Sequence, residues 1–230
     1  MLAFVSGYSQ QNSGTVVYKV MLAQDYDYKP TDALSKEIKE GNFVSLAKQR
    51  FLLEFNDIKS RFVRSNSLSI DENRKEQLYD KMASNRYSSS YDYYLDNKLK
   101  IGVFRYGTDG KLVSQIVRDK EWDISTESKK IGDYLCYKAV YHRSYVNWKG
   151  KDITVPVIAW FAPSLPYRYG PKQYYGLPGL ILELHESSSV FLATEIKIGG
   201  EKQIKIEFPK GKVITEEEYK EYESSFIIKS

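Results

Sequence analysis

One stretch decides how the second half of this chain is arranged: Tyr174-Tyr175-Gly176-Leu177-Pro178-Gly179-Leu180-Ile181-Leu182-Glu183-Leu184. Its first half has no regular hydrophobic period, whereas its second half is a short apolar run typical of a buried strand. Pro178-Gly179 suits the central positions of a type II turn, because proline fixes φ at the first position and glycine accepts the positive φ of the second. We therefore expect a rigid bend that leads directly into a strand at Leu180.

The bend ends a longer irregular crossing that begins after Phe161. Four prolines and three glycines are interspersed through it: Pro163, Pro166, Pro171 and Pro178 with Gly170, Gly176 and Gly179. Proline restricts the backbone and glycine allows conformations closed to other residues. An ordered segment without repeating structure needs both. We expect the crossing to be ordered although it is neither helix nor strand.

Alternating hydrophobicity predicts antiparallel strands on both sides of the crossing. The expected strands or hairpin arms cover residues 15–23, 51–55, 62–63, 99–103, 112–117, 135–141, 153–161, 180–184, 190–198 and 204–208. Tight turns are expected at Gly107-Thr108-Asp109-Gly110 and at Gly199-Gly200, where both glycines accept positive φ. Ser88-Ser89-Ser90 and its tyrosine-rich neighbours are expected to form a mobile link.

Capping residues predict about three helices. The first runs from Ala33 to Lys39 and is stopped by Gly41. The second runs from Glu72 to about Ser84, is capped by Ser69 or Asp71, and packs through an apolar stripe of Leu78, Tyr79 and Met82. The third begins after Thr215, where Glu216, Glu217 and Glu218 lie at the positive end of the helix dipole.

Together these elements predict an α+β fold, with a strongly curved antiparallel sheet that resembles a half-barrel and about three helices against its concave side. Residues 15–230 are expected to form a single domain. Residues 1–14 are expected to be either the remnant of a secretory signal peptide or a disordered tail, because Leu2-Ala3-Phe4-Val5 is followed by small residues before Gln10.

Composition excludes several classes of protein. The chain has 230 residues, and its 34 Lys+Arg against 30 Asp+Glu leave a net charge of +4 that is spread along the sequence, so nucleic acid is not an expected partner. No apolar stretch approaches the ~18 residues that cross a bilayer, so no transmembrane span is expected. The single cysteine, Cys136, excludes an intramolecular disulfide and sites that need several thiolates.

The residues around the bend resemble the GLPGLI family, whose name is the sequence found here at Gly176-Leu177-Pro178-Gly179-Leu180-Ile181. The segments 134–139 and 159–166 are similar to the segments that precede this motif in the family. The resemblance covers about the last 80 to 100 residues. It implies an exported protein of the Bacteroidetes lineage, periplasmic or associated with the cell envelope, of uncharacterised activity, and it supplies no catalytic residues.

No catalytic or metal constellation is apparent in the sequence. On a regular strand, Cys136 and His142 would lie about 20 Å apart, too far for proton transfer, so Cys136 is interpreted as a packing residue. His185 lies near Glu183 and Glu186, but no second imidazole shares its face, so a solvent-facing histidine is favoured over a metal ligand. We therefore expect no catalytic residues, no metal and no cofactor.

The candidate ligand site is the crossing itself, where six aromatic rings fall within 16 positions: Trp160, Phe161, Tyr167, Tyr169, Tyr174 and Tyr175. They could enclose an apolar or sugar-like small molecule, or they could plug the open end of the core. The leading hypothesis is a non-catalytic binding or carrier module of the cell envelope. The alternative is an accessory protein that docks on an outer-membrane protein or complex through a sheet edge. An enzyme is the third possibility.

Overall fold

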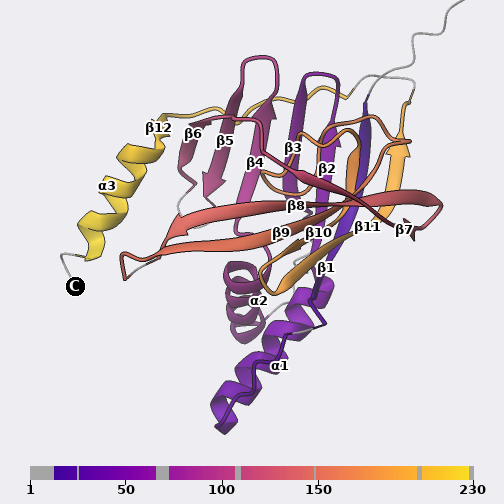
Figure 1. Cartoon of the computed structure of the whole chain (residues 1–230). Coiled ribbons are helices and arrows are strands. Elements are labelled where there is room, and N and C mark those ends of the chain that lie inside the picture. Colours follow the sequence, from indigo (N-terminus) through magenta and orange to yellow (C-terminus); the bar gives the residue numbers. More distant parts are fainter. Residues whose placement is uncertain are drawn as a thin grey trace, which may run out of the picture.

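The computed structural model describes residues 13–24, 26–65, 73–106, 110–147, 149–200 and 204–227. A 12-stranded sheet contains every described strand, in the order β12-β6-β5-β4-β3-β2-β1-β11-β10-β9-β8-β7 (Figure 1). The strands are β1 (Gly14–Leu22), β2 (Arg50–Phe55), β3 (Lys59–Ser65), β4 (Tyr91–Asp96), β5 (Ile101–Tyr106), β6 (Leu112–Ile116), β7 (Asp123–Ile131), β8 (Tyr134–Val146), β9 (Asp152–Ala162), β10 (Leu180–Glu186), β11 (Ser189–Ile198) and β12 (Val213–Thr215); the helices are α1 (Ala33–Lys48), α2 (Arg74–Tyr87) and α3 (Glu216–Ile227). All pairings are antiparallel except that of β12 with β6.

The sheet is strongly curved, as the sequence predicts. Strands β6 and β8 are near opposite ends of the strand order, yet Ile116 of β6 and Tyr141 of β8 line the same hollow. Figure 1 shows the long β8–β9 hairpin crossing β4 and running past the lower ends of β5 and β6. The two ends of an open sheet can meet in this way only if the sheet bends, so the prediction of an α+β, half-barrel-like sheet is confirmed.

The concave face holds the main core. Tyr18, Phe51, Phe62 and Phe191 are fully buried or nearly so, and the rings of Phe51 and Phe62 stack with their centroids 5.3 Å apart. Phe191 meets both of these rings edge-on at 5.5 and 6.0 Å. Burying side chains of this size contributes about 2 kcal/mol each, so this cluster is a main source of the sheet's stability.

The crossing between β9 and β10 fills one part of the concavity. Its backbone is tied down by bonds from the Leu180 amide to the Leu165 carbonyl at 2.9 Å and from the Ile181 amide to the Tyr169 carbonyl at 3.0 Å. The Tyr18 hydroxyl donates to the Ile181 carbonyl at 2.6 Å from across the sheet. The six-residue motif at 176–181 therefore fixes an ordered segment against the core, as expected.

The predicted type II turn at Pro178-Gly179 is wrong, because Gly179 does not have a positive φ. The left-handed residue is Gly176, with φ of 99°. Gly179 is required for a different reason: a Cβ there would overlap the backbone carbonyl of Ala162 at the end of β9. The motif thus brings two backbone segments into contact.

Helix α1 is longer than predicted and passes through Gly41 instead of ending there. A Cβ at Gly41 would overlap the ring of Tyr79 on α2, so this glycine allows close helix packing. Asp32 caps the N-terminus of α1, since its side chain accepts from the Ser35 amide at 2.8 Å. Gly41 therefore allows the two helices to pack closely, although in the sequence it looks like a residue that ends a helix.

Helix α2 is capped by Asn73 through a capping box with Glu76, while the predicted caps Ser69 and Asp71 lie outside the described residues. The predicted apolar stripe is not its buried face: Leu78 is 54% exposed, whereas Asp80, Ala83, Ser84 and Tyr87 are buried. The third helix begins as predicted, with Thr215 and Glu218 forming reciprocal side-chain to backbone bonds.

Three strands, β4, β7 and β12, were not predicted, and the strand predicted at residues 204–208 does not form. The expected mobile link at 88–90 leads directly into β4, and β7 had no expected counterpart. Residues 204–210 form no strand, so the Gly199-Gly200 hairpin is wrong. Instead, Phe208 packs on Tyr94 of the outer face with ring centroids 5.7 Å apart. The predicted turn at 107–110 lies outside the described residues except for Gly110, and so do residues 1–12 of the predicted N-terminal tail.

Candidate functional site

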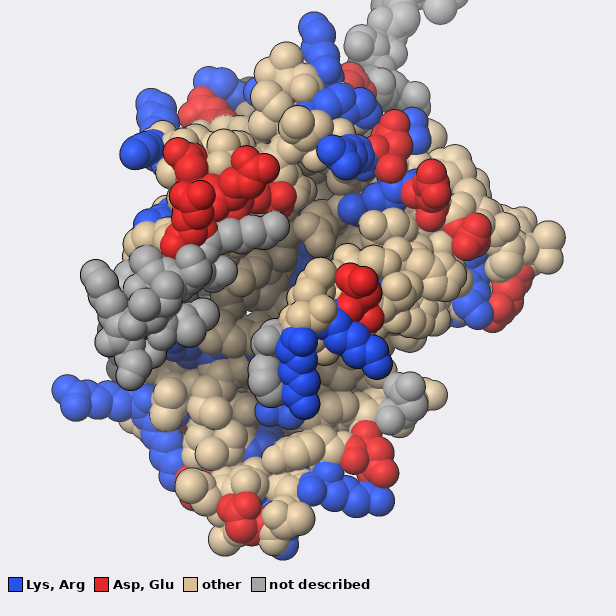
Figure 2. Space-filling view, turned by 60° about the vertical axis from the view of Figure 1, so that its left-hand side comes forward, with Lys and Arg blue, Asp and Glu red and all other residues tan. Residues whose placement is uncertain are grey.

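A cleft of about 590 Å³ opens on the concave face, beside the part that the crossing fills. Its walls are the C-terminal end of α2 with residues 88–90, the concave side of β4 and β5, and the turn between β10 and β11. We call it the serine–tyrosine cleft after its most frequent lining residues. Figure 2 shows a deep hollow in this side of the molecule, with acidic side chains gathered on one rim and basic ones within and below it.

One wall of the serine–tyrosine cleft is aromatic. Tyr91 and Tyr93 alternate along β4 and pair with Tyr106 and Phe104 of β5, so all four side chains share one face. The ring centroids of Tyr91 and Tyr106 are 4.5 Å apart, and those of Tyr93 and Phe104 are 5.1 Å apart. Tyr219 of α3 stacks on Tyr106 at 4.0 Å and extends the wall. The wall therefore presents several ring surfaces to whatever enters.

The floor of the cleft is a charged cluster around Glu186. One carboxylate oxygen of Glu186 accepts from Arg143 Nη1 at 2.8 Å and from the Tyr174 hydroxyl at 2.6 Å, and the other accepts from Lys172 Nζ at 2.6 Å. Burial alone would raise the pKa of Glu186, but Lys172, Tyr174 and Arg143 together hold the pKa below its ordinary value. Burial, and then the charge of Glu186, raises the pKa of Tyr174, so this hydroxyl remains a donor.

A second hollow of about 1070 Å³ adjoins this floor and lies between β6, β8 and the start of α3. We call it the edge hollow. Arg143 and Gln173 line both spaces and therefore lie at the junction between them. Lys120 lines the edge hollow, and its Nζ lies 5.1, 5.6 and 5.3 Å from the ring centres of Tyr141, Tyr174 and Tyr175. This arrangement is a cation enclosed by tyrosine rings.

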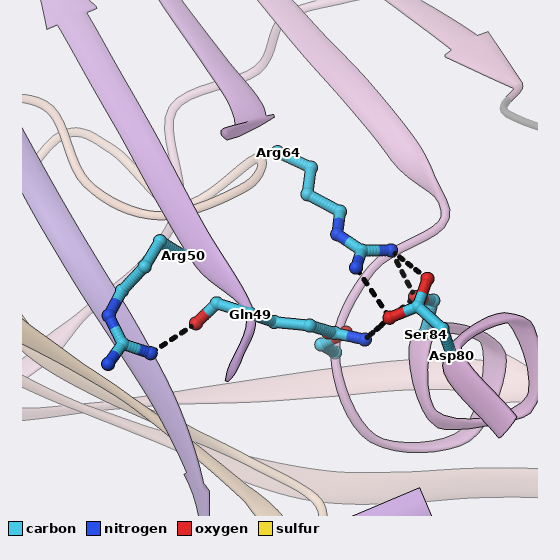
Figure 3. Close-up of polar contacts among 6 residues, drawn as sticks. Gln49, Arg50, Arg64, Asp80 and Ser84 are labelled. Atoms are coloured by element: carbon cyan, nitrogen blue, oxygen red, sulfur yellow. Dashed lines mark hydrogen bonds and ion pairs between the residues drawn. The ribbon is translucent and has the colours of Figure 1, made fainter. Parts of the chain in front are cut away.

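A buried polar network positions the α2 wall of the cleft (Figure 3). Arg64 of β3 donates to both carboxylate oxygens of Asp80, at 2.7 and 2.5 Å. Fully buried Gln49 donates to Asp80 at 3.1 Å and to Ser84 at 3.0 Å, and its side-chain oxygen accepts from the Ser88 hydroxyl at 2.5 Å. Every bond of this network joins α2, or the residue after it, to Arg64 of β3 or to Gln49, which connects α1 with β2, so the network fixes residues 84–88 at the cleft.

The structure places the six predicted aromatic residues mainly inside the protein. Five are buried, and Tyr167 is partly buried: the buried ones are Trp160, Phe161, Tyr169, Tyr174 and Tyr175. Trp160 lies on the outer face, where Lys129 covers its ring at 4.3 Å, while Phe161 points to the concave side. Lys120 lies near the rings of Tyr174 and Tyr175, and Tyr175 itself lines the edge hollow. These positions agree with the packing alternative for most of the set.

The other candidate groups are separated. Burial raises the pKa of the Cys136 thiol to about 11, so the thiol is protonated at neutral pH. His185 contacts Glu183, which also accepts from Lys129 at 2.7 Å. Glu186 points to the opposite face and is not part of this group. Within the described ranges, no three His, Cys, Asp or Glu side chains gather as metal ligands, and no helix has the length and apolar character that a membrane crossing needs.

Sequence reasoning missed the residues that line the cleft. The alternation of Tyr91 and Tyr93 was a usable signal for one face of a strand, but the preceding serines suggested a loop. The floor brings together residues 143, 172 and 186, which come from β8, the crossing and the end of β10. β8 and β10 both pair with β9, and the crossing joins β9 to β10, so the strand order and the path of the crossing make these segments neighbours.

The Glu186 cluster predicts a stability effect that depends on pH. A carboxyl whose folded pKa is depressed contributes stability above its unfolded pKa and loses that contribution as pH falls through the folded pKa. Glu186→Gln is therefore expected to lower the free energy of unfolding at pH 7 by about 2 kcal/mol. The difference from the parent protein should shrink as pH falls below the ordinary value near 4.5. Urea unfolding between pH 7 and pH 3 measures both effects.

Glu195→Gln is the control for this experiment, because Glu195 is exposed and its nearest cation, Lys197, is 3.7 Å away. Its substitution should change stability little at any of these pH values. A difference between parent and Glu186→Gln that stays constant from pH 7 to pH 3 would contradict the role assigned to the charge.

The comparisons with known proteins match the crossing and the overall fold. A family model described as "Protein of unknown function (Porph_ging)" matches residues 148–183, which include all of β9, the crossing and the start of β10. No curated protein matches the sequence. Structures of PNGF-II in space groups C2 and P21 are similar, each with a TM-score of 0.52, at 15% and 16% identity.

The similarity to PNGF-II covers 91% of this chain and 32% of each PNGF-II chain, so this chain spans about a third of the length of those proteins. At this level of identity the similarity shows the fold alone. Together with the described sheet, it defines this chain as a β-rich α+β protein with an open, mostly antiparallel sheet.

Proposed function

We propose that this chain is a non-catalytic binding module of the cell envelope that holds a sugar-like ligand in the serine–tyrosine cleft. The observation that carries the proposal is that aromatic rings and serine hydroxyls together line one open space. A pyranose ring has the matching surfaces: its C–H faces pack on aromatic rings, and its hydroxyl groups exchange hydrogen bonds at the edge.

The cleft is suited to a polar ligand more than to a lipid chain. Serines 84, 88, 89, 90, 187 and 189 line it, together with the side chain of Asn85. A serine hydroxyl can both donate and accept, as a sugar hydroxyl does; those of residues 84, 88, 89 and 90 already hydrogen-bond within the protein and offer a ligand their remaining capacity. The volume of about 590 Å³ lies within the range of sites that hold small molecules. These features favour the sugar-like ligand over the apolar one among the expected possibilities.

The charged floor supports binding without catalysis. Glycoside hydrolysis generally requires two carboxyl groups that flank the scissile bond. Glu186 is the single carboxylate among the described lining residues of the cleft, and three donors already engage it. A carboxylate held in this way is a poor general base, because its lone pairs are directed at Arg143, Lys172 and Tyr174.

Export and an envelope location are part of the same proposal and rest on the resemblance of residues 176–181 to the GLPGLI motif. The alternative function is docking on an outer-membrane protein through a sheet edge. Strand β7 supports this alternative, since it pairs only with β8 and most of its residues are exposed. Its charged side chains, including Glu127 and Lys130, disfavour the addition of a further strand. The sugar-binding proposal therefore ranks first.

The direct test measures the binding of oligosaccharides to the full chain. Screening on an array of bacterial and host oligosaccharides should identify ligands, and titration calorimetry should confirm them in solution. Tyr91→Ala should weaken binding about tenfold, because about 1.4 kcal/mol is a reasonable contribution for one ring of the wall. The measurement is the ratio of dissociation constants for the variant and the parent protein.

Tyr28→Ala is the matched control, because Tyr28 and Tyr91 are both 38% exposed and Tyr28 does not line the cleft. It should leave the dissociation constant unchanged. If no oligosaccharide binds, or if the Tyr28 and Tyr91 variants bind equally well, the cleft is not a sugar site. Capture of an envelope protein that is lost on substitution in β7 would support the alternative instead.

A further inference from the structure

The floor of the serine–tyrosine cleft carries more positive than negative charge. Arg143 and Lys172 both contact Glu186, so two cations share one carboxylate. The side chains of Lys172 and Glu186 are only 12% and 9% exposed, and that of Arg143 is 32% exposed. Charge in such a position is poorly solvated and is stabilised by a counter-ion. One positive charge on this floor lacks such a partner among the described side chains.

Lys120 adds a second positive charge from the side of the edge hollow, whose lining also includes Arg118 and four carboxylates, those of Asp119, Glu121, Glu216 and Glu217. It shares the ring of Tyr174 with the cluster, since Lys120 lies over that ring and the Tyr174 hydroxyl donates to Glu186. No carboxylate forms an ion pair with Lys120 among the residues that the structure describes. Burial lowers the pKa of Lys120; Glu186 opposes this effect and Arg143 adds to it. An anion near Lys120 would offset both the cost of burying its charge and its repulsion from Arg143.

Arg143 retains unused donor capacity at the junction of the two hollows. Its Nη1 donates to Glu186 and its Nε is enclosed by the protein, so the donors that a ligand can reach are those of the terminal nitrogens on this 32% exposed side chain. A guanidinium group has five N–H donors in a planar fork that matches a carboxylate. A ligand carboxylate could therefore be bound here without displacing Glu186.

We propose that the sugar-like ligand is acidic, and that the junction formed by Lys120, Arg143 and Lys172 binds the carboxylate of a uronic-acid residue. This inference rests on the proposed function, because it assigns the chemistry of the same ligand. The sugar ring lies against the tyrosine wall, and the carboxylate points toward the floor. Rings on one side and cations on the other then determine the orientation of the ligand.

The experiment compares trigalacturonic acid with its methyl ester, which has nearly the same size and no charge. Titration calorimetry with the full chain should give at least tenfold tighter binding of the acid. The affinity of the acid should fall when salt is raised from 50 to 200 mM, while that of the ester should stay constant, because salt screens only the charged interaction. The salt comparison uses the parent protein, so it does not depend on the folding of a variant.

Lys120→Met removes one cation and keeps a long apolar side chain within the tyrosine rings. It should weaken binding of the acid about tenfold and leave binding of the ester unchanged. Lys130→Met, on the exposed part of β7, has the same change in net charge and should affect neither ligand. Circular dichroism confirms that each variant is folded before it is titrated.

The outcomes separate the two proposals. Equal affinity for the acid and the ester, or an equal loss for both in Lys120→Met, would overturn the acidic ligand and leave a neutral sugar site in place. Absence of binding by both trisaccharides, together with every neutral and acidic oligosaccharide of the array, would overturn the sugar site and the acidic ligand together.

Discussion

Gly179→Val is expected to lower the free energy of unfolding by about 3 kcal/mol or more. A Cβ at this position would overlap the carbonyl oxygen of Ala162, and it would lie 2.7 Å from the carbonyl carbon and 3.0 Å from the Phe161 ring. The obstructing atoms belong mostly to the backbone of β9, so they cannot move aside as a flexible side chain could. The shift in the urea unfolding midpoint, analysed with a common slope, measures the effect.

Two variants serve as controls for Gly179→Val. Cys136→Ser changes one atom at a buried site and should cost less, even though the new hydroxyl is enclosed. Gly132→Ala is placed at a positive φ of 56° with no atom within 4 Å of the new Cβ, so its cost should be about 1 kcal/mol of backbone strain. Equal melting temperatures for Gly179→Val and Cys136→Ser would show that the contact between the crossing and β9 does not limit stability.

The strands that follow a regular alternation could be predicted because one face of each is buried. β2 alternates intermediate and buried residues throughout, and β1 does so along most of its length. Strand β7 has no such alternation, because its residues are nearly all exposed and their sequence is polar on both faces. Strand β7 is held to β8 by the hydrogen bonds of its backbone, and such bonds leave no hydrophobic pattern in the sequence.

The helices show a similar limit. The end of α1 was predicted at Gly41 because glycine commonly ends a helix, whereas here it makes room for Tyr79 of α2. The apolar stripe of α2 was assigned to the core, but Asp80 and Ser84 of α2 contact Arg64 of β3 instead. A buried polar face cannot be recognised from hydrophobicity, since its partners, Gln49 and Arg64, are distant in sequence.

The candidate site was the least predictable part of the molecule. The number of aromatic residues suggested the crossing as the ligand site, but the structure encloses most of those rings in the core. The rings that line the cleft belong mainly to β4 and β5, where aromatic residues alternate with residues of the outer face. Which aromatic residues are enclosed depends on where the crossing lies in the concavity, and this follows from the path of the whole sheet.

Asp80→Ala is expected to lower the free energy of unfolding by about 3 kcal/mol, because it removes the acceptor for the Arg64 guanidinium and for the fully buried Gln49 amide. The side chains of Arg64 and Asp80 are 22% and 12% exposed, so water cannot fully replace the lost carboxylate. Urea unfolding measures the change. The same variant should also weaken oligosaccharide binding, since residues 84–88 lose one of their attachments to the sheet.

A second arginine–aspartate pair provides the matched comparison. Arg105 and Asp92 also form an ion pair, but their side chains are 45% and 19% exposed, so Asp92→Ala should cost less than about 1 kcal/mol. The double variant Arg64→Met with Asp80→Leu should be more stable than Asp80→Ala alone, because it leaves no buried charge unpaired. If Asp80→Ala and Asp92→Ala are equally destabilising, burial does not distinguish the pairs, and the network does not hold α2 at the cleft. If Asp80→Ala is destabilising while binding is unaffected, the network supports the fold without positioning the site.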